Sequence, residues 1–355
     1  MVGSESRLGA AACVIRELDE PAATGWDRFV LDHPAGTFFH RAGWKQVIER
    51  AMGHRCRYAY AERDGRIVGV LPLAHVKTAL FGNRLVSTPF CVYGGPLATD
   101  ETVRRALTEH AIRIQDELQV DWLEFRSRER TQPGWTSQGD LYSTFRKEIP
   151  TGEQEILKSI PRKARAVVRK AIDDDALEER TDETPDRFHH VYSVSVRNLG
   201  SPVFSRKYCR WLKQAFGDDC EFFVLATRGG LPVAGVLSFY FRDEILPYYG
   251  GGTEAAREYG AHAYMYWRLM VRAAARGVRV FDFGRSKRGT GAYSFKTNFG
   301  FSPDTLLYEY RMKEGVSLPD ATTLNPKYRS LIATWKRLPL PIANAIGPFL
   351  VRRLG

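Results

Sequence analysis

The residues best suited to chemistry lie close together in the segment 281–300, FDFGRSKRGTGAYSFKTNFG. An apolar strand that carries one acid, Asp282, runs into a glycine-rich loop with three cations, Arg285, Lys287 and Arg288. Glycines let backbone amides approach a ligand, and the cations can pair with phosphate. In α/β sheets, ligands gather beyond the carboxyl ends of the strands. The pattern therefore predicts a ligand site in this loop.

Lys296 follows the loop and is flanked by Phe295 and Phe299. This is typical of a cation aimed into an apolar cleft, where its charge is little screened. The alternative is a lysine whose stem covers aromatic rings while its ammonium stays in water. Asp282 also has an alternative role, as a strand-end acid that caps a nearby loop. Lys296 is the first catalytic candidate and Asp282 the second.

Three tyrosines near glycines, Tyr248, Tyr249 and Tyr293, are candidate substrate contacts, although packing alone explains them equally well.

A basic helix is predicted within 151–175, with a break or kink at Pro161. A helical wheel separates a basic arc from an apolar arc. The basic arc holds Arg162, Lys163, Arg165, Arg169 and Lys170, and the apolar arc holds Ala164, Val167, Val168, Ala171 and Ile172. No acid interrupts the cations before Asp173. This favours a phosphate or tRNA contact over an idle solvated face, because idle surfaces usually mix both signs.

These candidates belong to a chain that repeats one order of elements twice. The order is a glycine-turn hairpin, a Tyr-Gly-Gly motif, a helix and a strand. It occupies 60–71, 93–96, 100–118 and 122–125 in the first copy and 225–237, 249–252, 260–276 and 280–283 in the second. The repetition predicts an α/β (α+β) fold of two tandem units with mixed sheets.

We expect a first domain at 12–148, a basic helical connector at 149–180, a second domain at 181–315 and a tail at 316–355. The first copy has no counterpart of the loop 285–300. The second is therefore expected to carry the site, and the first to be scaffold and acceptor wall.

Length and composition agree with two domains, because 355 residues with 44% hydrophobic content can fill two cores. Lys and Arg exceed Asp and Glu by 52 to 41, a formal charge of +11. This favours an anionic partner such as tRNA, a nucleotide-linked intermediate or an acidic membrane, although an ordinary basic enzyme remains the alternative. The five cysteines form neither a CxxC pair nor a Cys/His cluster, so we expect no metal site and a reducing, cytoplasmic location.

The end of the chain, WKRLPLPIANAIGPFLVRRLG at 335–355, is apolar with basic ends. No stretch approaches the roughly 18 apolar residues of a spanning helix. Two interpretations remain open for this tail. It lies on the inner face of a membrane as a peripheral contact, or it packs on the protein as a proline-broken segment.

Several motifs together resemble the FemAB family, and in particular its members associated with PEP-CTERM/exosortase and exopolysaccharide systems. The similar motifs are Phe39-His-Arg-x-x-Trp44, Gly69–Leu73, Tyr93–Pro96, Lys163-Ala-Arg165 with Val168–Ala171, Asp282–Gly284 and Phe295-Lys-x-x-Phe-Gly300. They span roughly 15–312. The resemblance implies two tandem GNAT-like domains and a catalytic role for Lys296. It also implies transfer of an amino acid from aminoacyl-tRNA to an amine of a cell-envelope precursor such as that of peptidoglycan, without a tightly bound cofactor.

Two other functions stay open. A GNAT N-acyltransferase that uses acyl-CoA in polysaccharide modification needs Q/R-x-x-G-x-G/A, and here Arg257-x-x-Gly260 ends on His262. This histidine is more typical of capping or packing than of catalysis. A non-catalytic RNA- or membrane-binding protein would use the basic helix and the tail, but segment 281–300 favours an enzyme. No DNA partner is expected.

Overall fold

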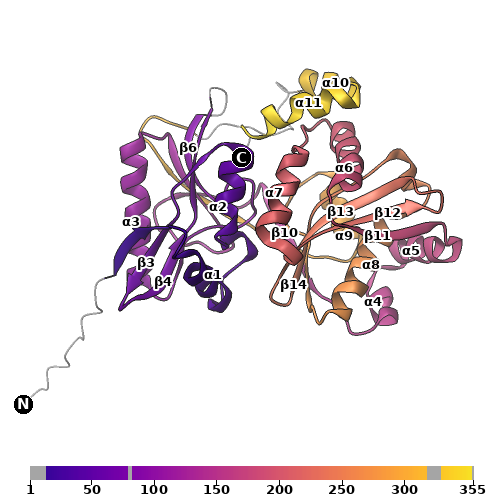
Figure 1. The fold of residues 1–355 in the computed structure, drawn as a ribbon, viewed down its shortest axis with the longest axis horizontal. Coiled ribbons are helices and arrows are strands. Elements are labelled where there is room, and N and C mark those ends of the chain that lie inside the picture. The colour runs from indigo at the N-terminus through magenta and orange to yellow at the C-terminus, as the bar shows by residue number, and fades with distance from the viewer. Residues whose placement is uncertain (1–12, 79–81, 318–328, 354–355) are drawn as a thin grey trace, which may run out of the picture.

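The computed structural model describes residues 13–78, 82–317 and 329–353. Two lobes stand side by side, and a pair of C-terminal helices lies across one end of them (Figure 1). The part of the expected tail at 318–328, and the last two residues, fall outside the described residues.

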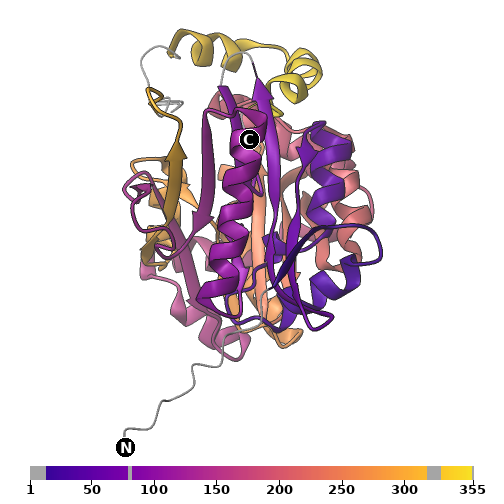
Figure 2. The ribbon, with the colours of Figure 1, turned by 90° about the vertical axis from the view of Figure 1, so that its left-hand side faces the viewer.

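The first lobe holds a four-stranded and a six-stranded sheet. Their orders are β1-β3-β4-β7 and β2-β5-β6-β8-β18-β9. The strands are β1 (Val14–Glu17), β2 (Arg55–Cys56), β3 (Ala59–Arg63), β4 (Arg66–Leu71), β5 (Leu73–Thr78), β6 (Gly82–Ser87), β7 (Leu97–Ala98), β8 (Trp122–Ser127), β9 (Thr136–Gln138) and β18 (Leu307–Met312). The helices are α1 (Ala23–Asp32), η1 (Phe38–His40), α2 (Gly43–Val47), η2 (Ile48–Met52) and α3 (Glu101–Leu118). Figure 2 shows α3 lying across the outer face of this lobe.

The second lobe is built on one sheet of order β11-β12-β13-β14-β15-β10-β16, with β17 paired to β10. Its strands are β10 (Tyr142–Glu148), β11 (Leu177–Asp182), β12 (Cys220–Thr227), β13 (Pro232–Phe241), β14 (Glu244–Gly252), β15 (Val280–Asp282), β16 (Ser286–Lys287) and β17 (Pro303–Thr305). Its helices are α4 (Glu153–Ser159), α5 (Arg162–Asp174), α6 (Asp186–Leu199), α7 (Arg206–Phe216), η3 (Gly217–Asp219), η4 (Glu254–Arg257), α8 (Ala261–Ala275) and α9 (Gly291–Asn298). The C-terminal pair is α10 (Arg329–Arg337) and α11 (Leu340–Val351).

The two lobes repeat the same order of elements, as the sequence predicts. Hairpin β3–β4 corresponds to β12–β13, α3 to α8, and β8 to β15. Each lobe contains one parallel pair, β6 with β8 and β14 with β15. Asp64 and Gly65 turn the first hairpin with φ of 51° and 71°, whereas in the second hairpin Gly230 alone takes a positive φ, 82°. The Tyr-Gly-Gly motifs differ, since the first lies in a loop and the second in β14.

Strand pairing crosses the domain boundaries that the sequence predicts at 148 and 315. β10, from the first expected range, pairs with β15, so that Arg146 faces Asp282. β18, from the second expected range, pairs with β8. The antiparallel neighbour of β15 thus comes from the first expected domain and that of β8 from the second. Local sequence patterns could not reveal these pairings, because the two strands of each pair are remote in the sequence.

The connecting helix is divided as expected, with Pro161 separating α4 from α5. Its apolar arc is narrower than the wheel predicts. Val168 and Ala171 are buried, whereas Val167 and Ile172 remain 42% and 38% exposed. α5 packs on α8, and Val167 contacts the turn at Gly260 where α8 begins, while much of its side chain stays in solvent.

An aromatic core joins the lobes. Phe38 of the first lobe stacks on Phe239 of the second, with 4.4 Å between ring centroids, and lies 4.6 Å from the ring of Phe216. Trp44 packs against Phe216 and Phe239 as well. The two lobes therefore share one close-packed hydrophobic core.

Candidate active site

A cavity of about 420 Å³ opens where β14 and β15 diverge. The two strands are parallel partners only at Glu244–Ile245 and Val280–Phe281. Beyond that point β14 bulges away, with a register shift opposite Leu237 and Ser238. Residues 247–250 form one side of the cavity and residues 283–286 the other. The first lobe contributes Phe90, Val92 and Arg126, so that both lobes are needed to form the walls.

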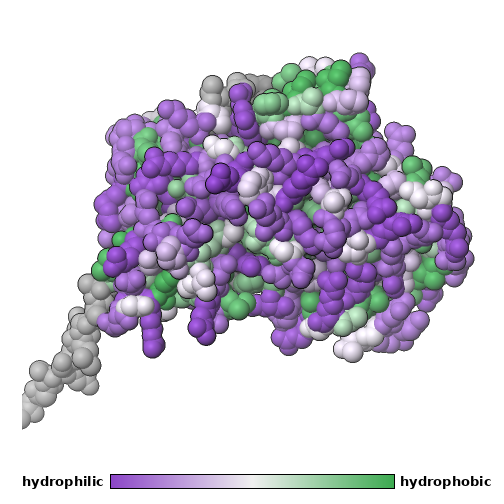
Figure 3. Space-filling view, viewed as in Figure 1, coloured by the Kyte–Doolittle hydropathy of each residue, from purple (hydrophilic) through white to green (hydrophobic). Residues whose placement is uncertain are grey.

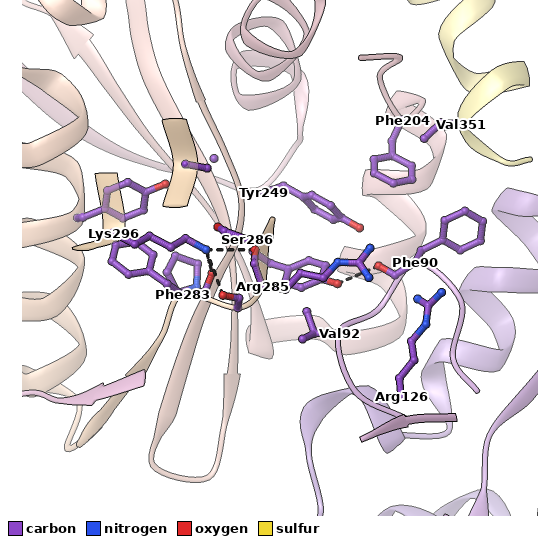
Figure 4. Close-up of a pocket in the computed structure, with 16 residues that line it drawn as sticks. Phe90, Val92, Arg126, Phe204, Tyr249, Phe283, Arg285, Ser286, Lys296 and Val351 are labelled. Atoms are coloured by element: carbon purple, nitrogen blue, oxygen red, sulfur yellow. Dashed lines mark hydrogen bonds between the residues drawn. The ribbon is translucent and has the colours of Figure 1, made fainter. Parts of the chain in front are cut away.

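Figure 4 shows the two ends of this cavity. Lys296 and Phe283 lie at one end, and Phe90, Phe204 and Val351 lie at the other. Arg285 stands between them, and Arg126 lies near Phe90 at the second end. Among the lining residues in the described part of the chain there are three cations and no carboxylate. The cavity is therefore positive, and its wall is apolar where it meets the C-terminal helix.

Lys296 lies on helix α9, and its side chain lines the cavity. Thr290 caps the helix by accepting a hydrogen bond from the amide of Tyr293. The Nζ of Lys296 donates to the carbonyl oxygens of Phe283, Gly284 and Arg285 at 2.7, 3.1 and 3.3 Å. Its side chain also lies over the rings of Phe145 and Phe283. The predicted placement of a cation in an apolar cleft agrees with this geometry.

The charge of Lys296 is set by opposing influences. Burial lowers its pKa to about 7, and the negative field of Asp282 acts in the other direction. An ammonium group has three N–H donors, and here each has a carbonyl acceptor. Those contacts favour the charged form. Lys296 therefore carries a positive charge below about pH 7 and loses it as the pH rises through the physiological range.

Asp282 is buried behind the cavity and does not line it. Its carboxylate accepts hydrogen bonds from Arg146 at 2.9 Å, from the amide of Gly284 at 2.7 Å and from the hydroxyl of Tyr93 at 3.3 Å. Gly284 has a φ of 61°, which the bond to Asp282 helps to fix. This is the loop-capping arrangement. Asp282 therefore fixes the turn whose carbonyl groups hold Lys296, and its catalytic role stays a prediction.

Two arginines present positive charge to the cavity. Arg285 donates to the hydroxyl of Tyr308 at 2.8 Å and lies over the ring of Tyr142. Arg126, on β8, donates to Glu124 at 2.7 Å and to the carbonyl of Cys91. Sequence reasoning singled out Arg285 but missed Arg126. Arg126 carries no local signal of a site, because its strand also holds Glu124, with which it pairs.

The tyrosines form a second polar group. Tyr249 lines the cavity, and its hydroxyl lies 2.9 Å from that of Tyr208. Tyr248 lines it too and donates to the carbonyl of Phe90 at 2.8 Å. Burial raises the pKa of Tyr249 well above its ordinary value, so this hydroxyl stays protonated. Phe204, Tyr266 and Val351 complete this wall and carried no sequence signal, because each is an ordinary core residue in its own segment.

The other predicted site residues on the loop and on α9 lie outside the cavity lining. Lys287 sits in β16, paired with Tyr142, and Arg288 is exposed. Tyr293 packs edge-on against Phe145, and Phe295 stacks on Phe299. Ala292 is the neighbour that reaches the cavity in their place.

The basic arc of α5 forms a separate surface feature. Lys163 and Arg169 are exposed and Arg165 is partly so. Arg162, Arg165, Arg169 and Lys170 border a shallow hollow that Asp173 and Asp174 share. None of these cations lines the Lys296 cavity. Their contact with an anionic donor remains a prediction.

Helix α8 begins beside α5, at the turn formed by Arg257-x-x-Gly260. Gly260 has no side-chain cap, and the first turn carries no acid. Val167 covers this turn, since a Cβ on Gly260 would lie 2.7 Å from its Cγ1. His262 packs against Gly252, and burial lowers its pKa, which keeps the ring neutral. The packing interpretation of His262 fits this position.

Comparison with known proteins supports the fold. The family model described as an acetyltransferase (GNAT) domain matches residues 158–297, which include α5 and Lys296. No curated protein sequence matches the chain. The chain is similar in structure to FemX, at a TM-score of 0.65 and 14% identity, with 83% of this chain and 96% of FemX covered.

Two further structures are similar over most of their length. One is L-PGS from Bacillus licheniformis, at a TM-score of 0.55 and 16% identity, covering 96% of this chain and 98% of that one. The other is a tandem GNAT protein from the clavulanic acid biosynthesis pathway, at 0.52 and 13%, covering 85% and 98%. The chain thus has a mixed α/β fold of two tandem GNAT-like domains, as predicted, and its second half carries an acetyltransferase (GNAT) domain.

Proposed function

We propose that this chain is an N-acyltransferase that moves an aminoacyl or acyl group from an anionic, activated donor onto an amine of a cell-envelope or exopolysaccharide precursor. The observation that carries the proposal is the buried ammonium of Lys296 at the point where β14 and β15 diverge, inside a cavity lined by cations. Acyl transfer needs fixed positive charge where the oxyanion develops.

The reaction needs no bound cofactor in this proposal. The amine nitrogen forms a bond to the acyl carbon, and negative charge develops on the former carbonyl oxygen. The bond to the oxygen or sulfur of the donor then breaks, and the leaving atom keeps the bonding electrons and takes up the proton that the amine loses. The positive charges of Lys296 and Arg285 stabilise the oxyanion through space, because the three N–H groups of Lys296 already have carbonyl acceptors, while the protonated Tyr249 can donate a hydrogen bond. Among the described residues no group of His, Cys, Asp and Glu could hold a metal ion.

For the donor we favour aminoacyl-tRNA, because Val167 covers the turn at Gly260 and α5 adds five cations beside it. An acyl-CoA is the second candidate, since the start of α8 carries neither a capping side chain nor an acid. The family model, an acetyltransferase domain, supports this second donor.

Two experiments test the donor and the role of Lys296. The purified chain is heated with charged tRNA, acetyl-CoA and a long acyl-CoA in turn, because a ligand selective for the native state raises the unfolding temperature. Protection by charged tRNA alone is the expected result, and protection by CoA thioesters alone would favour the second donor. With the donor known, Lys296→Ala is expected to reduce kcat by about 10²–10³-fold, with partial recovery in Lys296→Arg. A fully active Lys296→Ala variant would contradict the proposal.

A further inference from the structure

The C-terminal helices expose the apolar side chains that a helix normally buries. α11 packs on the second lobe through small or slender residues, Ala343, Gly347 and Val351. Its large side chains point away, with Ile342, Ile346, Phe349 and Leu350 at 44%, 43%, 58% and 36% exposed, and Leu331 of α10 is 67% exposed. We call these five residues the C-terminal apolar face. Figure 3 shows hydrophobic side chains gathered over α10 and α11.

Close packing holds α10 and α11 in these positions on the second lobe. A Cβ on Gly347 would lie 3.0 Å from the amide nitrogen of Val203, so that the inner side of α11 sits directly on backbone. The indole of Trp335 donates to the carbonyl of Ser201 at 2.9 Å, and Arg197 donates to that of Leu338. α11 is therefore held with its large apolar side chains outward, whereas α10 packs Ile332 against Gly200 and leaves Leu331 in solvent. Contiguous exposed apolar patches mark interaction sites.

Cations surround the C-terminal apolar face, and the sequence from 329 to 353 contains no acid. Lys336, Arg337 and Arg353 are exposed, and Arg352 is partly so. None of the four forms an ion pair with another residue that the structure describes. A second copy of the chain would bring these like charges together around the face, whereas an anionic surface would neutralise them.

We propose that the C-terminal apolar face docks on the surface of a phospholipid bilayer that contains anionic lipids. The apolar side chains enter the boundary between headgroups and acyl chains, and the cations pair with phosphate groups. α11 has 12 residues, and no helix in the described ranges is long and apolar enough to cross a membrane. The helix pair therefore lies on the bilayer without spanning it.

Docking in this orientation places the cavity at the membrane. Val351 of α11 forms part of the cavity wall, next to Phe90 and Phe204. His54 holds the end of this helix, since its Nε2 lies 2.6 Å from the carbonyl oxygen of Arg352. The apolar end of the cavity thus meets the docked helix. We infer that the acceptor amine is presented at the bilayer surface, a step that rests on the proposed function.

The test is cosedimentation of the full chain with phosphatidylcholine vesicles that contain or lack phosphatidylglycerol. The triple variant Ile342→Ser, Ile346→Ser, Phe349→Ser is expected to lower the partition coefficient on anionic vesicles at least about tenfold. A matched control, Val14→Ser with Leu231→Ser, removes side chains that are 55% and 58% exposed elsewhere and is expected to bind like the wild type. Lys336→Gln, Arg337→Gln, Arg353→Gln should weaken binding to anionic vesicles by about 10²-fold.

Three results would overturn the docking proposal. The wild type stays in solution with anionic vesicles, or the triple serine variant binds as tightly as the wild type. In the third, the wild type does not bind vesicles but forms a dimer in sedimentation equilibrium, and the triple serine variant is a monomer. That result would assign the face to a second copy. Vesicle binding needs neither donor nor acceptor. If the wild type does not bind vesicles but still transfers the acyl group to a water-soluble amine, only the docking proposal fails. If it binds vesicles but shows no transfer, only the proposed function fails.

Discussion

Lys296 combines a buried position with three hydrogen bonds to carbonyl oxygens, and these features act in opposite directions on its charge. Burial in a low-dielectric site disfavours the ammonium, whereas the carbonyls and Asp282 favour it. A lysine in this balance can carry a charge at pH 7 and still lose it within the range where enzymes work. Such perturbed groups cluster at functional sites.

The stability of the fold should depend on this titration. The pKa of Lys296 is about 7 in the fold and 10.5 in its ordinary state. Between those values the unfolded chain binds more protons, so that the free energy of unfolding rises with pH. Relative to Lys296→Met, the wild type should gain up to about 1.4 kcal/mol per pH unit over this interval. Denaturant titrations at several pH values measure the difference in slope.

Lys207→Met serves as the control, because this lysine is exposed. Its pH dependence should follow the wild type. Equal slopes for the wild type and Lys296→Met would show that Lys296 keeps its ordinary pKa in the fold.

The sequence predicts site residues that lie close together in the chain, but not those that are brought to the site from remote segments. Lys296, Arg285 and the loop that carries them fall within one segment, and the pattern of glycines, cations and aromatics locates them. Arg126 and Phe90 meet that loop only through the packing of the lobes. The sequence leaves Asp282 between a catalytic role and loop capping, because its partners Arg146 and Tyr93 are remote in the sequence and their contacts are seen only in the structure.

At the scale of elements, α5 has two separate faces with separate tasks. Val168 and Ala171 pack it on the second lobe, and Val167 covers the start of α8. The free side holds five cations and no acid before Asp173, at the end of the helix. The free side is therefore available to bind an extended anion, whereas the packed side fixes the position of the helix relative to the cavity.

Charge reversal on the free side should weaken donor binding and spare the chemical step. Arg165→Glu with Arg169→Glu is expected to raise the donor Kd about tenfold or more, and to reduce the salt dependence of a tRNA donor by roughly two phosphate contacts. Arg105→Glu with Arg113→Glu on α3 makes the same change in net charge at exposed positions of the first lobe. Equal weakening by both pairs would mean that net charge, and not α5, attracts the donor.

Sequence periodicity located these elements well but not their full environment. The hairpins, α3, α8 and the break at Pro161 follow from turn residues and spacing. The exposure of Val167 and Ile172 does not, because a wheel cannot say how wide a strip the partner helix covers. The outward face of α11 is a similar case, in which the small residues Ala343 and Gly347, and not the large ones, make the contact.

At the scale of the whole molecule, the first lobe depends on a strand from the far end of the chain, and the two lobes share a core. All strands of the second lobe's sheet lie between Tyr142 and Thr305, whereas β18 returns to pair with β8 of the first lobe. Phe38 packs on Phe239 across the interface. The repeated order of elements predicts two units, but the return of β18 is a long-range pairing that no local pattern encodes.

The shared core should make the two lobes unfold together. Scanning calorimetry is expected to give one transition, with calorimetric and van't Hoff enthalpies in agreement, although chains of this size often unfold in steps. Phe38→Ala at the interface should lower the unfolding temperature of that one transition, at a cost of about 3–5 kcal/mol. Two resolved transitions in the wild type would show that the lobes are independent.

The place of β18 also sets an order of events during synthesis. The strand that closes the first sheet, Leu307–Met312, is made about 180 residues after its partner β8, whose last residue is Ser127. Until it emerges from the ribosome, the edge of β8 is an open template for pairing with other chains. The first half of this protein must therefore wait for almost all of the second before it can finish folding, and the nascent chain is exposed to misassembly throughout that interval.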